Sequence, residues 1–274
     1  MHKPENLNIS GDLTVLLPAY NELVNLRILI PKIIAVTQSL EGMKTQILVV
    51  LPSFASPSEV AEIKTLGAQP VTRFPTDSFG NAIRTGFAAS VVSTEFIITM
   101  DADCSHNPEL IPSLLQNAPN AHIVSASRYV SGGSSDAKRR QQLMSRLVNF
   151  AFTIVLGEKI HDISGNYKLY RRSIVSQLEL TGKNFDIIQE IVFKTKKLSG
   201  KAFNLVEVPY RWNERLDGKP KRRLVPYIFS YVQMLLKFAI LRLKHWGKGA
   251  DKQFDTAPLK NLTTHELFES CVFY

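Results

Sequence analysis

Short apolar runs alternate with longer amphipathic stretches along the first half of the chain. The runs of strand length are 13–17, 46–51, 71–74, 96–100 and 122–127. After the first run, apolar residues recur at helical spacing, at Leu26, Leu29, Ile30, Ile33 and Ile34. Because strands that alternate with helices build βαβ units, this order predicts an α/β domain with a mostly parallel central sheet flanked by helices.

Helix signals also occur between these runs and after them. Ser56-Pro57 and Asn107-Pro108 each combine an N-cap residue with proline at the first helical position. Farther along, the pattern predicts helices over 143–156 and 185–198 and a last strand over 205–208.

Two carboxylates follow the apolar run 96–100 directly, at Asp101 and Asp103. Open α/β sheets bind ligands at the carboxyl ends of their parallel strands. Mg²⁺ and Mn²⁺ prefer oxygen ligands, and carboxylates bind Mg²⁺ together with substrate phosphates. The pair therefore predicts a metal site. The alternative is a helix N-cap, which explains Asn107 and Pro108 but not the two aspartates before them.

Small residues are frequent from Ser78 to Gly86. Gly80 and Gly86 allow close backbone approach, which a phosphate or nucleotide loop requires. Close packing of a helix on the sheet would explain the same two glycines. Both interpretations stay open from the sequence.

A basic loop and a strongly apolar stretch follow the last predicted strand. Five cations lie in nine residues from Arg215 to Arg223, a density that suits phosphate capture as well as solvated surface. Residues 224–246 carry one continuous apolar face with Lys and Arg interleaved, and the uncharged run is shorter than the roughly 20 residues of a membrane span. We expect an amphipathic helix at the membrane interface; docking on the protein's own core or on a second subunit is the alternative.

Composition and charge limit the classes of molecule that the chain is expected to bind. The chain has 274 residues, a net charge of +9 and a pI near 9.5, which favours anionic partners. Its cations cluster beside apolar helices rather than among stacking aromatics, so no nucleic-acid binding is expected. Two cysteines, Cys104 and Cys271, and a polar N-terminal stretch without a signal segment predict a cytoplasmic location.

Six motifs together resemble one enzyme family. They are PAYNE at 18–22, GNAIRTG at 80–86, MDADCSHNP at 100–108, SRYVSGG at 127–133, DISGNYKLY at 162–170 and ERLDGKPK at 214–221. In this order they resemble inverting glycosyltransferases of family 2 with the GT-A fold, most of all the dolichyl- or polyprenyl-phosphate mannosyltransferase or glucosyltransferase branch. The resemblance extends from Leu13 to Arg223 and implies a catalytic domain over 1–223. The pattern of the remaining residues predicts the interface helix over 224–246 and a tail over 247–274.

The resemblance implies roles for residues on the donor side. Residues that would contact the nucleotide sugar are Pro18, Tyr20, Glu22, Gly80 and Asp101. Asp103, with Asp101 beside it, would hold Mg²⁺ or Mn²⁺. Ser105 stands where the family often has Gln, and would act on the metal through water.

On the acceptor side, Arg128 and Ser145 match positions that hold the acceptor phosphate. The family often has Arg where this chain has Gln141, so Arg140 would substitute. Arg215 and Lys221 match the mobile loop that closes on the donor and acceptor phosphates.

One position departs from the family pattern. Family members end the second strand in two acidic residues that read the nucleotide base, whereas here the run ends Leu51-Pro52-Ser53-Phe54. An apolar pair cannot accept a hydrogen bond from a base N–H. The base is then read differently, the donor is unusual, or donor binding is lost. Ser78 also replaces a glycine of the family.

The leading hypothesis is transfer of a hexose from a nucleotide-diphosphate sugar to a polyprenyl phosphate at the cytoplasmic face of a membrane. A phosphate acceptor is largely ionised near neutral pH, so no base is essential. A soluble hydroxyl acceptor would need one, with Asp186 or Glu190 as candidates. A degenerate membrane-associated subunit is the third hypothesis. An anchoring partner subunit or a homo-oligomer is compatible with each.

Overall fold

The computed structural model describes residues 11–214 and Leu235. Arg215, Lys221, the predicted tail 247–274 and the predicted helix 224–246 (apart from Leu235) lie outside the described residues. Leu235 is half-buried against the core of the domain.

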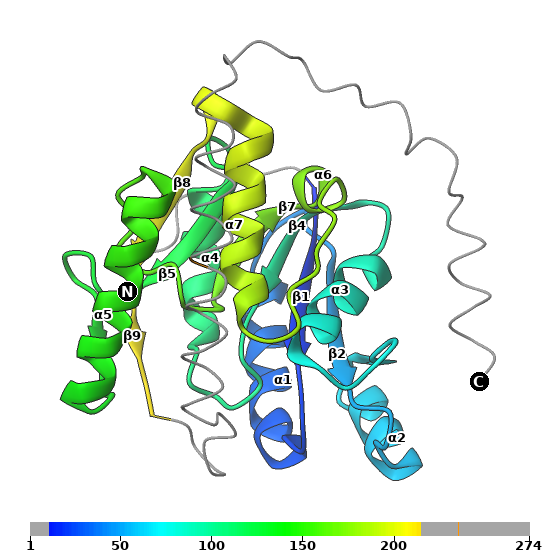
Figure 1. Cartoon of the computed structure of the whole chain (residues 1–274). Helices are drawn as coiled ribbons and strands as arrows, with labels where there is room; N and C mark the ends of the chain where they lie inside the picture. The colour runs from blue at the N-terminus through cyan, green and yellow to red at the C-terminus, as the bar shows by residue number, and fades with distance from the viewer. Residues whose placement is uncertain (1–10, 215–234, 236–274) are drawn as a thin grey trace.

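A seven-stranded sheet forms the centre of the domain, in the order β3-β2-β1-β4-β7-β5-β8 (Figure 1). Its strands are β1 (Asp12–Pro18), β2 (Thr45–Leu51), β3 (Gln69–Thr72), β4 (Thr94–Thr99), β5 (Ile123–Ser127), β7 (Lys168–Arg171) and β8 (Leu205–Pro209). Neighbours pair in parallel except β7, which is antiparallel to both β4 and β5. The predicted α/β class with a mostly parallel sheet is confirmed; β7 was not predicted.

Helices cover both faces of this sheet. They are α1 (Leu23–Gln38), α2 (Pro57–Thr65), α3 (Phe79–Ala89), α4 (Ile111–Gln116), α5 (Arg139–Leu156), α6 (Arg172–Val175) and α7 (Asp186–Ser199). Alternate strand residues face opposite sides, so Val15 packs with α1, α2 and α4, whereas Leu16 packs with α3, α5, α6 and α7. Two short strands, β6 (Ser134–Ser135) and β9 (Arg211–Trp212), pair separately.

Local chemistry explains where several helices begin. The Ser56 hydroxyl accepts a hydrogen bond from the Glu59 N–H at 3.1 Å, and the Asn107 side chain accepts one from the Glu109 N–H at 3.2 Å. Both predicted N-caps are therefore confirmed. Asn107 caps a 3₁₀ turn, Pro108–Leu110, that leads into α4.

The small-residue stretch is helical, with Ser78 as the N-cap of α3. A Cβ at Gly86 would come within 1.9 Å of the Leu16 side chain, and one at Gly80 within 2.0 Å of the Gly182 carbonyl oxygen. Close packing therefore accounts for both glycines, while nucleotide contact by Gly80 stays a prediction.

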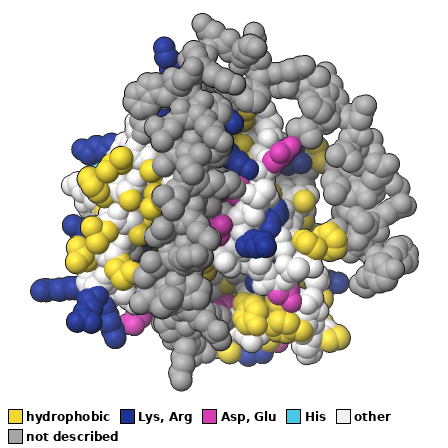
Figure 2. Space-filling model, viewed as in Figure 1, with side chains coloured by type: hydrophobic (Ala, Val, Ile, Leu, Met, Phe, Trp, Pro, Cys, Tyr) yellow, Lys and Arg dark blue, Asp and Glu magenta, His cyan; other side chains and the backbone are white. Residues whose placement is uncertain are grey.

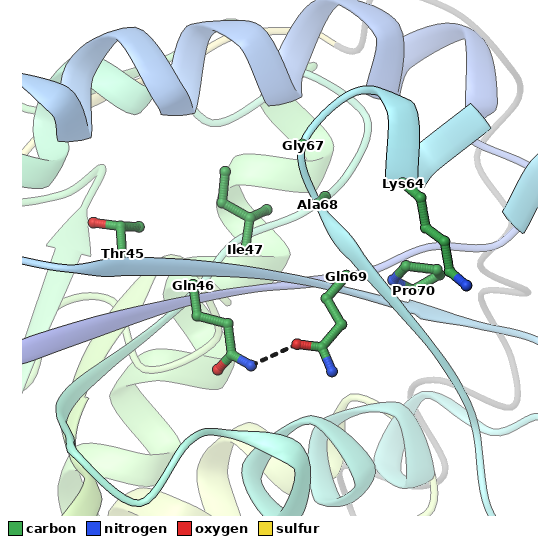
Figure 3. A pocket seen from close by; sticks show the side chains of 8 residues that line it. All are labelled: Thr45, Gln46, Ile47, Lys64, Gly67, Ala68, Gln69 and Pro70. Carbon is green, nitrogen blue, oxygen red and sulfur yellow. Dashed lines mark hydrogen bonds between the residues drawn. The ribbon is translucent and has the colours of Figure 1, made fainter. Parts of the chain in front are cut away.

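A surface hollow of about 630 Å³ lies near the amino ends of two strands, β2 and β3 (Figure 3). It is lined by residues at the amino ends of β2 and β3, where the Gln46 side chain donates to that of Gln69 at 2.8 Å. Because ligands of open α/β sheets bind at the carboxyl ends, this hollow is separate from the candidate site.

Candidate active site

The predicted donor residues meet where the strand order reverses. β1 is followed in the chain by β2 on one side, while β4 lies on its other side, so the switch point falls between β1 and β4. Pro18 ends β1, and Asp101 and Asp103 follow β4. The Met100 N–H donates to the Leu16 carbonyl at 3.1 Å, which fixes the two strand exits side by side.

Asp101 is oriented by two polar neighbours. Its Oδ1 accepts from Asn166 Nδ2 at 3.0 Å, and its backbone N–H donates to Nδ1 of His106 at 3.0 Å. His106 is buried and stacks on Tyr167 with ring centroids 4.9 Å apart. Sequence analysis missed His106 because it belongs to no recognisable catalytic motif. Its position, five residues after Asp101, was the only signal in the sequence that the two residues could meet.

Asp103 is buried, and its Oδ1 accepts from the Ser105 N–H at 3.1 Å and the Ser105 hydroxyl at 2.6 Å. Cys104 between them has a φ of 63°, which turns the chain back on itself. Ser105 thus orients the carboxylate of Asp103, and its action through a metal-bound water stays a prediction.

The oxygen ligands available at this position fit the metal ion that the sequence predicts. Asp101 and Asp103 offer carboxylate oxygens, the ligands that Mg²⁺ and Mn²⁺ prefer. Within residues 11–214, no group of three or more His, Cys, Asp and Glu side chains is arranged as a metal centre. Two protein carboxylates suit a cation whose other ligands come from a diphosphate and water.

Tyr20 and Glu22 follow Pro18 at the end of β1. The Tyr20 side chain is 40% exposed and meets Phe54 edge to face, with centroids 5.3 Å apart. Glu22 is buried and accepts from Asn25 Nδ2 at 2.6 Å. Of these two predicted nucleotide contacts, Tyr20 is therefore the accessible one.

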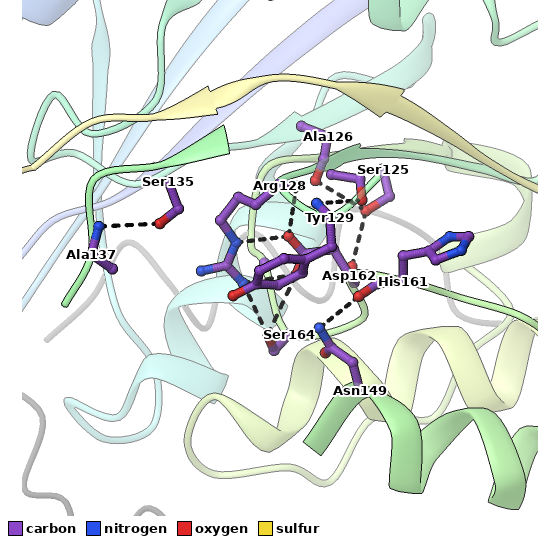
Figure 4. Close-up of polar contacts among 12 residues, drawn as sticks. Ser125, Ala126, Arg128, Tyr129, Ser135, Ala137, Asn149, His161, Asp162 and Ser164 are labelled. Carbon is purple, nitrogen blue, oxygen red and sulfur yellow. Dashed lines mark hydrogen bonds and ion pairs between the residues drawn. The ribbon is translucent and has the colours of Figure 1, made fainter. Parts of the chain in front are cut away.

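Arg128 forms a buried ion pair with Asp162 (Figure 4). Its Nε donates to Oδ2 at 2.7 Å and its Nη2 to Oδ1 at 2.8 Å. Burial by itself would raise the pKa of Asp162, but the charge and hydrogen bonds of Arg128, with the charge of Lys168, hold that pKa below its usual value. Sequence analysis missed Asp162, although the DISGN motif marked its position.

Lys168, the first residue of β7, binds the loop that carries Asp162. Its buried ammonium donates to the Ser125 hydroxyl at 2.8 Å and to the carbonyl oxygens of Gly165 at 2.6 Å and Asp162 at 3.2 Å. Burial lowers its pKa to about 8. Loop 162–165 is thus attached to both β5 and β7.

A second arginine contacts the same aromatic ring as Arg128. The Tyr129 ring centroid is 5.0 Å from Cζ of Arg128 and 5.2 Å from Cζ of Arg146. Arg146 follows the predicted phosphate ligand Ser145 on α5. Arg140 is exposed at the start of α5, and no described contact joins it to Arg128. Sequence analysis missed Arg146, which shares the Tyr129 ring with Arg128, a predicted contact of the acceptor phosphate.

The candidate bases Asp186 and Glu190 have structural partners. Glu190 accepts from the Thr181 and Gly182 N–H groups and pairs with Lys194 at 2.9 Å. Burial raises the pKa of Glu190, but these partners outweigh burial and lower it. Asp186 accepts from the Asn184 N–H at 2.6 Å.

Comparison with known proteins shows the family of this chain. Residues 14–179 match the family described as "Glycosyl transferase family 2". The chain belongs to this family. It is 30% identical over 270 residues to the dolichol-phosphate mannosyltransferase of Pyrococcus furiosus, covering 93% of this chain and 70% of that protein.

A further family 2 relative aligns over a shorter stretch. The undecaprenyl-phosphate mannosyltransferase of Micrococcus luteus is 30% identical over 150 residues, which are 53% of this chain and 60% of that protein. Both relatives carry a polyprenyl phosphate and a mannosyl group in their names.

Solved structures show the same fold. Glucosyl-3-phosphoglycerate synthase from Mycobacterium tuberculosis, in complex with Mn²⁺ and UDP, superposes with a TM-score of 0.65 at 16% identity, covering 88% of this chain and 86% of that one. Mannosyl-3-phosphoglycerate synthase from Rubrobacter xylanophilus gives 0.62 at 15% identity, with coverage of 93% and 80%. At this identity the likeness establishes the architecture of the family 2 domain alone.

Proposed function

We propose that this glycosyltransferase moves a hexose of the mannose or glucose type from a nucleotide-diphosphate sugar to a polyprenyl phosphate at a membrane surface, with inversion at the anomeric carbon. The names of the two curated relatives support the lipid-phosphate acceptor. Structures of a more distant relative with UDP-glucose and Mn²⁺ support the donor class.

The surface of α5 is the observation that carries the acceptor class. Four large apolar side chains, 58–64% exposed, recur along one side of the helix: Leu143, Leu147, Phe150 and Ile154. α5 contains no acidic residue, and Lys138, Arg139 and Arg140 begin it. Hydrophobic side chains gather over α5, with basic ones near its start (Figure 2). An apolar stripe flanked by cations suits an anionic lipid surface.

The same helix links that surface to the candidate phosphate site. Ser145 and Arg146 lie between Leu143 and Leu147, and Arg146 shares the Tyr129 ring with Arg128. A lipid tail along the stripe would place its phosphate beside two guanidinium groups. In the residues that the structure describes, no helix is both long enough and apolar enough to cross a membrane.

The residues would act mainly by position and charge. An ionised phosphate oxygen attacks the anomeric carbon, its new C–O bond forms as the bond to the donor diphosphate breaks, and no proton needs removal. Arg128 and Arg146 would orient the acceptor phosphate, and Arg215 and Lys221 would close on both phosphates. Mg²⁺ or Mn²⁺, held by Asp103 and Asp101, would supply positive charge at the leaving diphosphate.

The two other hypotheses have less support. A soluble hydroxyl acceptor needs a base, and the carboxylate of Glu190 already accepts from Thr181, Gly182 and Lys194. A degenerate subunit has no need for Asp101 and Asp103 to be held by dedicated partners, as Asn166 and Ser105 hold them.

Transfer by an Asp103→Asn variant tests the donor side. The amide keeps an oxygen for Ser105 but removes the charge, so we expect transfer to fall about 100-fold or more, with an unchanged unfolding midpoint. Glu62→Gln removes a carboxylate from the surface of α2 and serves as the control. Retained turnover in Asp103→Asn would contradict the metal role.

A Phe150→Glu variant tests the acceptor class. We expect it to lose binding to anionic vesicles and transfer to a long polyprenyl phosphate in them, while transfer to a short, water-soluble prenyl phosphate persists. Val24→Glu places the same charge on an exposed apolar position of α1 and should change neither. Equal transfer by Phe150→Glu and wild type to the vesicle-bound acceptor would refute the role of α5.

A further inference from the structure

The exit of β2 carries no acidic residue of its own, yet a carboxylate reaches it from the segment that follows β3. Asp77 lies in the segment between β3 and α3. Its Oδ1 accepts from the Ser53 N–H at 2.7 Å and its Oδ2 from the Ser53 hydroxyl at 2.6 Å. Ser53 is the second residue after β2, so Asp77 supplies a negative charge where β2 ends.

Two accessible aromatic rings lie at the same edge. Tyr20 follows β1 and Phe54 follows β2, and their side chains are 40% and 55% exposed while in edge-to-face contact. Phe54 is adjacent to Ser53, the partner of Asp77. Exposed aromatic rings beside a carboxylate suit a nucleobase, which stacks through its face and hydrogen-bonds through its edge.

Arg73 fixes these pieces relative to one another. It is buried, and its guanidinium donates to the carbonyl oxygens of Ala19 after β1, Val50 in β2 at 3.5 Å and Asp77 at 3.2 Å. Its Cζ also lies 5.8 Å from the Tyr20 ring centroid. The Arg73 side chain thus connects the ends of β1 and β2 to the segment that carries Asp77. These hydrogen bonds fix the position of Asp77 relative to Tyr20 and Phe54.

We propose that Asp77 reads the base of the donor nucleotide, with Tyr20 and Phe54 as the stacking surface, in place of acidic residues at the end of β2. The inference rests on the proposed function, because it names the base subsite of that donor. Each carboxylate oxygen has two lone pairs, so Asp77 can accept a further hydrogen bond beyond those from Ser53. With its carboxylate facing the ring nitrogen of the base, Asp77 favours guanine, through N1–H, and uracil, through N3–H. The amino groups of adenine N6 and cytosine N4 can also donate to a carboxylate, but they lie beside that nitrogen rather than on it. Adenine N1 and cytosine N3 carry no hydrogen and can only accept.

The test is isothermal titration of the full chain with GDP, ADP, UDP and CDP in the presence of Mn²⁺. We expect wild type to prefer GDP over ADP, or UDP over CDP, by about tenfold or more. Asp77→Asn keeps the size of the side chain and presents an NH₂ group that can donate. It should reduce that ratio about tenfold, whereas Asp136→Asn, a remote exposed control, should preserve it.

Two further variants separate base reading from support of the loop. Ser53→Ala removes the hydroxyl that donates to Oδ2 of Asp77 and keeps the backbone N–H that donates to Oδ1. It loosens the orientation of Asp77 and should also reduce the ratio, with an unchanged unfolding midpoint. Phe54→Leu removes stacking surface and should weaken all four nucleotides by a similar factor, leaving the ratio intact.

The outcomes distinguish this inference from the proposed function. Binding of GDP or UDP with a ratio that Asp77→Asn leaves unchanged, or equal weakening of all four nucleotides by Asp77→Asn, would overturn the role of Asp77 and leave the donor class standing. A preference for ADP or CDP in wild type would overturn it as well. Absence of binding to any of the four nucleotides would overturn the proposed function itself.

Discussion

The proposed donor and acceptor sides of the candidate active site are held in place in different ways. On the donor side, Asp101 and Asp103 directly follow β4, and Ser105 and His106 support them from within five residues. On the acceptor side, Arg128 follows β5, but its partner Asp162 is 34 residues away in the chain. The donor-side aspartates are therefore held largely by local partners, to which Asn166 adds one hydrogen bond from 65 residues away, whereas the Arg128–Asp162 pair depends entirely on the tertiary fold.

Because of this difference, substitutions on the two sides should affect turnover and stability differently. The Asp101 side chain remains 22% exposed, whereas that of Asp162 is fully buried and that of Arg128 is 13% exposed. Asp103 is buried as well, and the N–H and hydroxyl of the nearby Ser105 donate to it. Breaking a buried ion pair leaves a charge in the interior without compensation. We expect donor-side substitutions to act on turnover and acceptor-side substitutions to act first on folding.

The largest effect is expected from Asp162→Ala. The change leaves the Arg128 guanidinium without its bidentate partner in the interior, so the free energy of unfolding should fall by about 3–5 kcal/mol. Urea denaturation measures it. Glu62→Ala breaks the exposed pair with Arg27 and should leave the stability nearly unchanged. A similar small loss in both variants would remove the distinction between the two sides.

Glu190→Gln should have an intermediate effect. The carboxylate accepts from two backbone N–H groups and from Lys194, so the amide weakens these bonds and should cost about 1–3 kcal/mol of unfolding free energy. Turnover at a temperature where the variant is folded should persist. Complete loss of turnover without loss of stability would instead make Glu190 a catalytic base.

The smallest effect concerns the pH dependence of stability through Lys168. Its pKa is about 8 in the folded chain, below the ordinary 10.5. Between these values the unfolded chain binds a proton that the folded chain has released, so this group makes stability rise with pH in that window. The difference in unfolding free energy between wild type and Lys168→Met should grow by about 1 kcal/mol from pH 8 to pH 9. A constant difference across that interval would contradict the lowered pKa.

Sequence patterns predicted the parallel strands, their helices and the two aspartates, because each depends on neighbours close in the chain. The same reasoning missed β7, since its four residues begin with Lys168, which reads as solvent-exposed and is buried. It also missed the Arg128–Asp162 pair, because no spacing rule joins residues so far apart. The alternatives for Gly80 and Gly86 required the positions of Leu16 and Gly182, which only the folded chain provides.

The reversed direction of β7 has a consequence for how such a domain can diversify. Because Lys168 pairs with Thr99 of β4 and with Ser125 of β5, the beginning of β7 lies where its neighbours finish. The connection that carries Asp162, Ser164 and Asn166 is thereby inserted between the two halves of the sheet. Exchanging residues 162–165 of this connection changes the partners of Arg128 and leaves β1 and β2 untouched. One scaffold can therefore vary its proposed acceptor side while Asn166 stays in place as the partner of Asp101.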